Sequence, residues 1–188
     1  MTIKSVAVFA GANSGTNPEY LERGCELGRA LANAKVRVIF GGGHVGLMGA
    51  VADSALAAGG EVVGVMPQFL VDREIAHSAL TELVVVETMH QRKAQMMARS
   101  DAFVALPGGS GTLEEIFEAW TWTHVGLHAK PCALFNVAEF YTPLVTFLRH
   151  ATAEGFVKPL NLDELIVDDD PHRLLARLMA APVPAKRW

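Results

Sequence analysis

Two glycine-rich segments of this chain have the composition of anion-binding loops. Each follows a short apolar run and precedes a helix-length stretch: Gly41-Gly42-Gly43-His44-Val45-Gly46-Leu47-Met48-Gly49 and Pro107-Gly108-Gly109-Ser110-Gly111-Thr112. A glycine turn that opens a helix presents free backbone N–H groups at the positive end of the helix dipole, where a phosphate is stabilised. We therefore predict a phosphate or nucleotide site, with residues 108–112 around the phosphate. Tight turns without a ligand are the alternative.

The spacing of these glycines excludes one familiar nucleotide motif and weakens the case for another. No Gly-Lys-Ser/Thr follows either segment, so a Walker A loop is absent. The first segment does not fit GxGxxG in register with a following acidic residue, so a dinucleotide site is weakly supported. A third segment, Gly11-Ala12-Asn13-Ser14-Gly15-Thr16, follows the first apolar run and is a candidate wall of the same site.

Basic side chains gather on residues 89–99, which read MHQRKAQMMAR and follow an apolar run at residues 83–87. In a helix, Arg92 and Arg99 are seven residues apart and share a face, with Lys93 beside them. Arginine side chains match the geometry of phosphate oxygens, so this face is a candidate substrate contact. A solvated basic face is the other interpretation.

Carboxylates follow the second glycine segment at Glu114, Glu115 and Glu118, and Trp122 lies further along the same stretch. Steps of three and four place Glu115, Glu118 and Trp122 on one helix face. Acidic residues in a first turn usually just complement the helix dipole. A carboxylate beside a phosphate loop is also what glycosidic-bond cleavage needs, to stabilise an oxocarbenium-like state or to activate water.

The other reactive residue types predict no metal site and no covalent nucleophile. Of the seven histidines, His124 and His128 are four apart, but no HExxH pattern accompanies them. There is no GxSxG motif, and Cys25 lacks the surroundings of a nucleophile.

Alternating strands and helices must position these residues. Short β-branched or aromatic runs occur at residues 6–10, 36–40, 61–66, 83–87, 102–106, 132–135 and 165–167, and residues 18–34 have the spacing of an amphipathic helix. Apolar strands alternating with helices indicate a mostly parallel sheet covered on both faces. We predict one doubly wound, Rossmann-like α/β domain over residues 1–180, with a frayed tail at 181–188. Both glycine segments then lie at carboxyl ends of strands, where such folds bind ligands.

Composition limits the possible partners and location. The 188 residues carry 16 Lys and Arg against 20 Asp and Glu, a net charge of −4, which disfavours non-specific nucleic-acid binding. The longest uncharged stretch, residues 38–52, is short and broken by glycines, so it cannot span a membrane. Lys4 and the apolar run after it faintly resemble a secretory signal, but a buried first strand is the better interpretation. Two lone cysteines, Cys25 and Cys132, predict reduced thiols and a cytoplasmic protein.

Four blocks of residues together resemble the cytokinin-activating phosphoribohydrolase family, whose members are often labelled lysine decarboxylases. The blocks are GGGHVGLMG at 41–49, MHQRKAQM at 89–96, LPGGSGTLEE at 106–115 and TWTHVGLHAKP at 121–131. The resemblance extends from the first strand to about Pro159. The PGGxGTxxE signature together with the preceding HxRK block is highly specific.

The resemblance implies hydrolysis of the N-glycosidic bond of a nucleoside 5′-monophosphate, either AMP or an N6-substituted AMP, to free base and ribose 5-phosphate. By motif position, the family's catalytic arginine and glutamate fall on Arg92 and Glu115, and no metal or organic cofactor is needed. The implied substrate-binding residues are Gly108, Gly109, Ser110, Gly111, Thr112, Gly42, Gly43, Ser14, Lys93, Arg99 and Met89. A homodimer with sites near the subunit interface is also implied.

Three rival functions remain open. A lysine decarboxylase would bind pyridoxal phosphate on a lysine, but Lys93 and Lys130 lack a recognisable Schiff-base context. A nucleotide or molybdenum-cofactor carrier of the same fold would keep the glycine loops without needing Glu115 paired with Arg92. A nucleotide sensor would bind the monophosphate and leave it intact. The presence of both Arg92 and Glu115 favours the enzyme.

Overall fold

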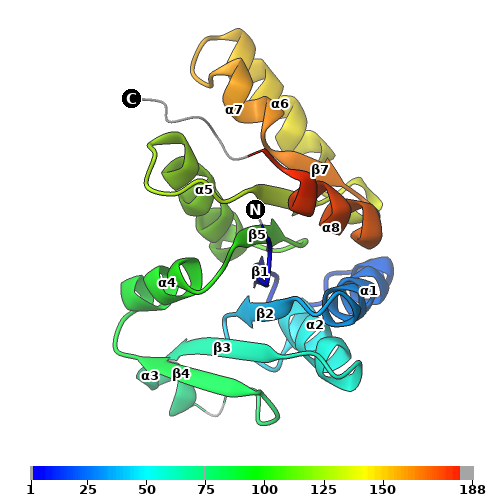
Figure 1. Cartoon of the computed structure of the whole chain (residues 1–188), viewed down its shortest axis with the longest axis vertical. Helices are drawn as coiled ribbons and strands as arrows, with labels where there is room; N and C mark the ends of the chain where they lie inside the picture. The colour runs from blue at the N-terminus through cyan, green and yellow to red at the C-terminus, as the bar shows by residue number, and fades with distance from the viewer. Residues whose placement is uncertain (1, 74, 183–188) are drawn as a thin grey trace.

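The computed structural model describes residues 2–73 and 75–182. Over this part of the chain seven parallel strands form one sheet with helices on both faces (Figure 1), so the predicted doubly wound α/β fold is confirmed. The strands are β1 (Ser5–Phe9), β2 (Arg37–Phe40), β3 (Val62–Pro67), β4 (Glu82–Val86), β5 (Ala102–Ala105), β6 (Cys132–Phe135) and β7 (Ile166–Asp168).

Helices lie between successive strands and after β7. They are α1 (Glu19–Asn33), α2 (Gly46–Ala57), α3 (Gln68–Val71), α4 (Met89–Ala98), α5 (Ser110–His124), α6 (Thr142–Ala153), α7 (Pro159–Asp163) and α8 (Pro171–Ala180), with a 3-10 turn η1 (Val137–Glu139) before α6. Helices α1 and α4 begin within a residue of the predicted helical segments at 18–34 and 89–99, and α2 and α5 begin within the two glycine segments. Helix α4 has a capping box, because Thr88 accepts from the backbone of Gln91 and the Gln91 side chain bonds back to Thr88.

The strand order β4-β3-β2-β1-β5-β6-β7 contains one reversal of direction. From β1 the chain adds strands on one side as far as β4, and it then crosses back to place β5 against the free edge of β1. Such a reversal is a topological switch point, and the crevice outside the carboxyl ends of the two strands is where doubly wound folds bind ligands. Here the two strands are β1 and β5.

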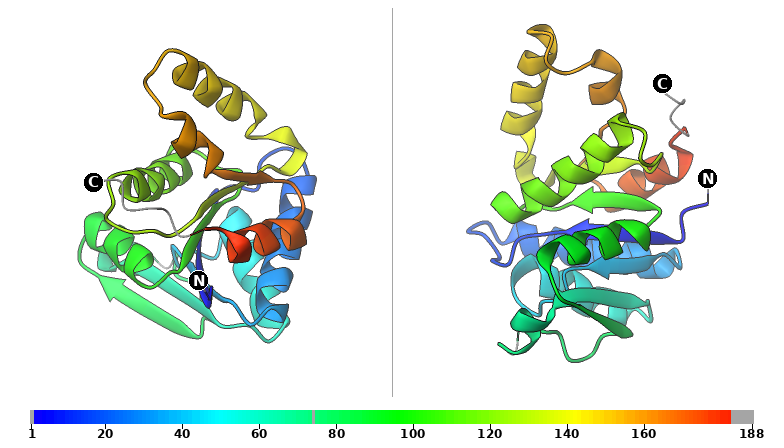
Figure 2. Two further views of the ribbon diagram at one scale, coloured as in Figure 1. Left: turned by 45° about the horizontal axis from the view of Figure 1, so that its top comes forward. Right: turned by 90° about the vertical axis from the view of Figure 1, so that its left-hand side faces the viewer.

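Alternate residues of each central strand face opposite helical layers. In β1, Val6 and Val8 pack in one apolar cluster with α1, α2 and α8, whereas Ala7 and Phe9 pack in the other with α4, α5 and α6. Figure 2 shows the two layers on either side of the sheet, with α1, α2 and α8 together on one side. Burial on both faces explains why these strands are apolar throughout.

Two parts of the fold differ from the sequence expectation or lie beyond it. The predicted cover of the sheet is incomplete at β4, which is an edge strand where Val85 is 45% exposed. Helix α8 ends at Ala180, and residues 183–188 of the predicted frayed tail lie outside the described residues. Within residues 2–73 and 75–182, no helix has the length and apolar character needed to cross a membrane.

Candidate active site

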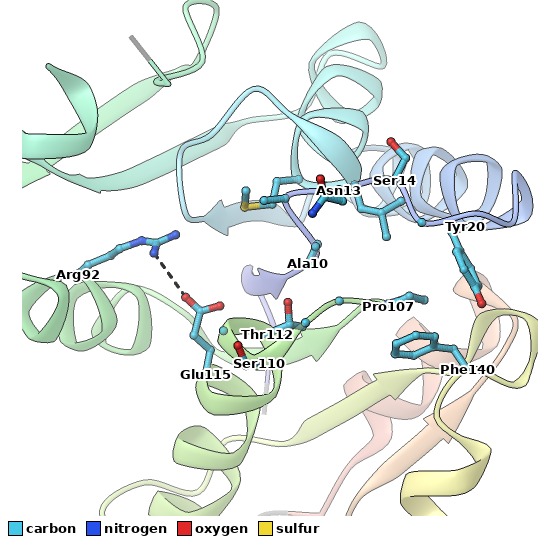
Figure 3. A pocket seen from close by; sticks show the side chains of 18 residues that line it. Ala10, Asn13, Ser14, Tyr20, Arg92, Pro107, Ser110, Thr112, Glu115 and Phe140 are labelled. Carbon is cyan, nitrogen blue, oxygen red and sulfur yellow. Dashed lines mark ion pairs between the residues drawn. The ribbon is translucent and has the colours of Figure 1, made fainter. Parts of the chain in front are cut away.

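A cavity of about 440 Å³ opens at the switch point between β1 and β5. Residues 10–15, which follow β1, form one wall, and residues 107–112, which follow β5, form another (Figure 3). The remaining lining residues come from α1, α2, α4, α5 and the segment before α6: Tyr20, Leu47, Met48, Arg92, Glu115 and Phe140. The sequence had placed residues 11–16 and 108–112 at such an edge, and the strand order brings them together.

The loop after β5 leaves its backbone open to the cavity. Gly109 is the N-cap residue of α5, whose first turn contains Ser110, Gly111 and Thr112. A Cβ added at Gly109 or Gly111 would meet no protein atom within 4 Å, so packing does not require glycine at either position. A Cβ at Gly108 would overlap the buried Thr112 side chain. Gly109 and Gly111 therefore leave room for a ligand, beside the positive end of the α5 dipole.

The first glycine segment has a different role from the one predicted for it. The N–H groups of Leu47 and Met48 donate to the Gly11 carbonyl at 3.0 and 3.4 Å, so a backbone carbonyl occupies the start of α2. Gly42 accepts a hydrogen bond from the backbone of His77 at 2.8 Å, and Gly43 forms a β-bridge with Ala76. Gly42 and Gly43 consequently do not line the cavity, whereas Leu47 and Met48 do.

Arg92 on α4 and Glu115 on α5 face each other at one end of the cavity (Figure 3). Their closest atoms, Arg92 Nη1 and Glu115 Oε1, are 3.8 Å apart, and their side chains are only 13% and 12% exposed. Arg92 Nε also donates to the Val65 carbonyl of β3 at 3.1 Å. The structure thus brings the two predicted catalytic residues together across two helices.

Burial raises the pKa of Glu115 above its ordinary value, because desolvation penalises the charged carboxylate. The Arg92 guanidinium opposes this effect and lowers the pKa of Glu115, although burial outweighs it. A carboxyl group with a raised pKa beside a phosphate loop is suited to exchange a proton with water or substrate.

Besides Gly42 and Gly43, three more of the predicted substrate-binding residues lie outside the residues that line the cavity: Lys93, Arg99 and Met89. Lys93 pairs with Glu114 and with Glu118, the latter at 3.0 Å between Nζ and Oε2. Arg99 pairs with Glu82 at 3.2 Å. Met89 approaches the Arg92 side chain, with its Sδ 3.9 Å from Nη1. Ser14 does line the cavity, in the loop after β1.

Two aromatic residues that the sequence did not single out lie at the end of the cavity away from the Arg92–Glu115 pair. Tyr20 of α1 and Phe140, which follows η1, pack edge to face with ring centroids 5.8 Å apart (Figure 3). No local motif marks either residue, because they meet only after α1 and the segment before α6 have packed together. Because Tyr20 and Phe140 are far apart in sequence, no motif with a fixed spacing could have identified them.

The described residues offer no metal site and no suitable cofactor lysine. Within residues 2–73 and 75–182, no group of three or more His, Cys, Asp or Glu side chains could hold a metal ion. No lysine is among the lining residues of the cavity. The Lys130 ammonium donates to the Met97 carbonyl at 2.6 Å, and Lys93 is paired with glutamates on α5. Among residues 2–73 and 75–182, no lysine in this cavity is therefore placed to form a Schiff base.

The fold and cavity define a doubly wound α/β protein whose switch-point cavity is lined by a glycine loop and a buried Arg–Glu pair. A family model described as "Possible lysine decarboxylase" matches residues 48–178. The cytokinin riboside 5′-monophosphate phosphoribohydrolase of Rhodococcoides fascians is 50% identical over 178 residues, covering 94% of this chain and 90% of that protein. Phosphoribohydrolase LOG7 of Arabidopsis thaliana is 45% identical over 157 residues, covering 84% of this chain and 72% of that protein. The chain therefore belongs to this phosphoribohydrolase family, as its motifs predicted.

Solved structures with the same architecture are more distant in sequence. The molybdenum cofactor carrier protein of Chlamydomonas reinhardtii has a TM-score of 0.72 at 23% identity, with 94% of this chain and 98% of that one covered. The molybdenum cofactor binding protein of Rippkaea orientalis has a TM-score of 0.71 at 22% identity, with 96% of this chain and 97% of that one covered. At these identities the likeness shows the fold alone.

Proposed function

We propose that this protein hydrolyses the N-glycosidic bond of adenosine 5′-monophosphates, including those with an N6 substituent, to a free cytokinin-type base and ribose 5-phosphate. The observation that carries this proposal is the buried Arg92–Glu115 pair beside the open glycine loop of α5. The curated relatives at 50% and 45% identity, both named cytokinin riboside 5′-monophosphate phosphoribohydrolases, support it.

In this mechanism the phosphate binds at the N-terminus of α5, against the backbone of Gly109 and Gly111, and thereby holds the ribose in place. Glu115 stabilises positive charge at the anomeric carbon and polarises the attacking water. The water oxygen bonds to C1′ and gives up one proton, the C1′–N9 bond breaks with its electron pair on the base, and the base takes up one proton from solvent as it leaves. Arg92 orients the substrate and balances the charge of Glu115. These steps need no metal or organic cofactor.

A carrier or sensor that binds the nucleotide without cleaving it is the alternative, and the solved structures that share the fold include molybdenum cofactor carrier and binding proteins. Such a protein needs the glycine loop but not a buried carboxylate with a raised pKa. The Glu115 side chain, 12% exposed and 3.8 Å from Arg92, favours the hydrolase.

The decisive experiment is chromatography of a panel of nucleoside monophosphates, with and without the 5′-phosphate, after incubation with the protein. We expect free base from the monophosphates, little from the nucleosides, and a loss of at least about 100-fold in kcat for Glu115→Gln. The exposed Glu22 of α1 supplies a matched control, and Glu22→Gln should retain full activity. Binding of intact nucleotide without release of base would instead establish a carrier or sensor.

The proposal also covers the extent of the functional domain, the oligomeric state and the location of the protein. We expect one functional domain over residues 1–180, a homodimer, and a cytoplasmic location. Large exposed apolar side chains on and after α6, Phe147 at 61% and Phe156 at 87%, support association with a second copy. The free thiols of Cys25 and Cys132 suit a reducing compartment. Light scattering of the purified protein tests the dimer.

A further inference from the structure

The Arg92 side chain reaches across the carboxyl ends of two strands before it faces Glu115. Its Nε donates to the Val65 carbonyl of β3 at 3.1 Å, and its Nη1 lies 3.8 Å from Glu115 Oε1. The third nitrogen, Nη2, lies against Gly41, the residue that directly follows β2. A Cβ at position 41 would occupy the space that this nitrogen takes.

Backbone geometry does not explain why residue 41 is glycine. Gly42, its neighbour, has a φ of +83°, which favours glycine, but Gly41 is not among the residues with positive φ. The nearest heavy atoms to a Cβ at this position all belong to the Arg92 guanidinium: Nη2, Cζ and Nε. The missing side chain at Gly41 therefore makes room for the Arg92 guanidinium.

We infer that Gly41 is a positioning residue for the reaction: it lets the Arg92 guanidinium lie against the end of β2 and so directs it toward Glu115. The catalytic part of this inference rests on the proposed hydrolase function. A guanidinium held by the Val65 carbonyl on one side and by Gly41 on another has little freedom to turn away from the cavity. A methyl group at position 41 would push it from this place, toward the substrate or out of line with Glu115.

Kinetics of Gly41→Ala test the catalytic part. We expect kcat to fall by about 10- to 100-fold, because a displacement of about 1 Å at a catalytic group has effects of that size, with KM within about threefold of wild type. Gly24→Ala is the matched control, since a Cβ there would lie 3.4 Å from Leu106 in ordinary contact and no Arg92 atom is among its three nearest neighbours. An unchanged kcat in Gly41→Ala would overturn the inference.

A thermal-unfolding cycle tests the contact itself and does not depend on any activity. We expect Gly41→Ala to lower Tm by a few degrees in the wild-type background and by less than about 1 °C in the Arg92→Ala background, because truncating Arg92 removes the overlap. If Gly41→Ala alone does not fold but the double variant does, the coupling is equally demonstrated. Equal losses in both backgrounds, or failure of both variants to fold, would refute it.

A wild-type protein that cleaves no nucleotide contradicts the proposed function, while this unfolding cycle still decides the role of Gly41 in placing Arg92.

Discussion

At the scale of single residues, the site depends on one carboxyl group held between two opposing effects. Burial disfavours the ionised form of Glu115, and the Arg92 guanidinium, 3.8 Å away, favours it. Burial prevails, so the pKa of Glu115 lies above its ordinary value. Since the folded state then favours the protonated form, any stability from this group is present at low pH and is lost as the pH rises through the folded pKa.

The same balance predicts how activity depends on pH. In the proposed mechanism Glu115 must be ionised to stabilise the anomeric carbon. The acidic limb of the pH profile of kcat/KM should therefore lie above the ordinary pKa range of a glutamate. Arg92→Met should move this limb to higher pH, since it removes the charge that lowers the pKa of Glu115. Arg92→Lys, which keeps the charge, is the control and should shift the limb much less. A limb that moves to lower pH in Arg92→Met would contradict this account.

At the scale of elements, an ion-pair cluster joins the two helices that carry Arg92 and Glu115, the proposed catalytic pair. Lys93 of α4, with a side chain only 11% exposed, pairs with Glu114 and Glu118, which lie one turn apart on α5. Burial acts to lower the pKa of Lys93, but its bonds to these two glutamates outweigh it and the pKa is raised. The cluster therefore favours one spacing of α4 and α5, on which the distance between Arg92 and Glu115 depends.

Replacing Lys93 distinguishes this role from direct substrate binding. We expect Lys93→Met to lower the free energy of unfolding by about 1 kcal/mol and kcat several-fold, with little change in KM. Arg37→Met, which breaks a pair with Glu61 whose side chains are 50% and 57% exposed, should cost less than about 0.5 kcal/mol in chemical denaturation. A raised KM with unchanged stability would instead identify Lys93 as a substrate contact.

At the scale of the whole molecule, the cavity joins parts of the chain that are distant in sequence. Its lining extends from Ala10 to Phe140 and draws on both halves of the sheet, which meet where β1 pairs with β5. A ligand bound here contacts the folded arrangement only, because the unfolded chain does not bring these segments together. Ligand binding must therefore stabilise the fold.

Thermal unfolding in the presence of ligand measures this coupling. Ribose 5-phosphate, a product of the proposed reaction, at 100 times its Kd should raise the free energy of unfolding by about 2.7 kcal/mol. Gly111→Asp should abolish the effect by placing a carboxylate in the anion site, while the free protein stays stable. Space is open at this position, and an acidic residue suits the first turn of α5. Gly111→Asn is the uncharged control, and equal ligand stabilisation in Gly111→Asp and wild type would place the phosphate elsewhere.

Much of the fold was predictable because its signals are local. The apolar runs at residues 102–106 and 132–135 match β5 and β6 to within a residue, and the helix expected over 18–34 is α1. A strand followed by a glycine turn and a helix also places residues 107–112 at a carboxyl edge, whatever the neighbouring strands are. Arg92 and Glu115 could be identified from a family motif, which records their positions in sequence but not the distance between them.

The sequence by itself determined the elements, the parallel sheet and the glycine loop of α5, because these depend on periodicity and on turns within a few residues. Only the tertiary structure decided which loops meet. By pairing β1 with β5 it made residues 10–15 the second wall of the cavity, and it joined Gly42 and Gly43 to residues 76–77 instead. It also placed Gly41 beneath Arg92 and Tyr20 beside Phe140. These contacts arise from strand order and helix packing, which no spacing within one segment encodes.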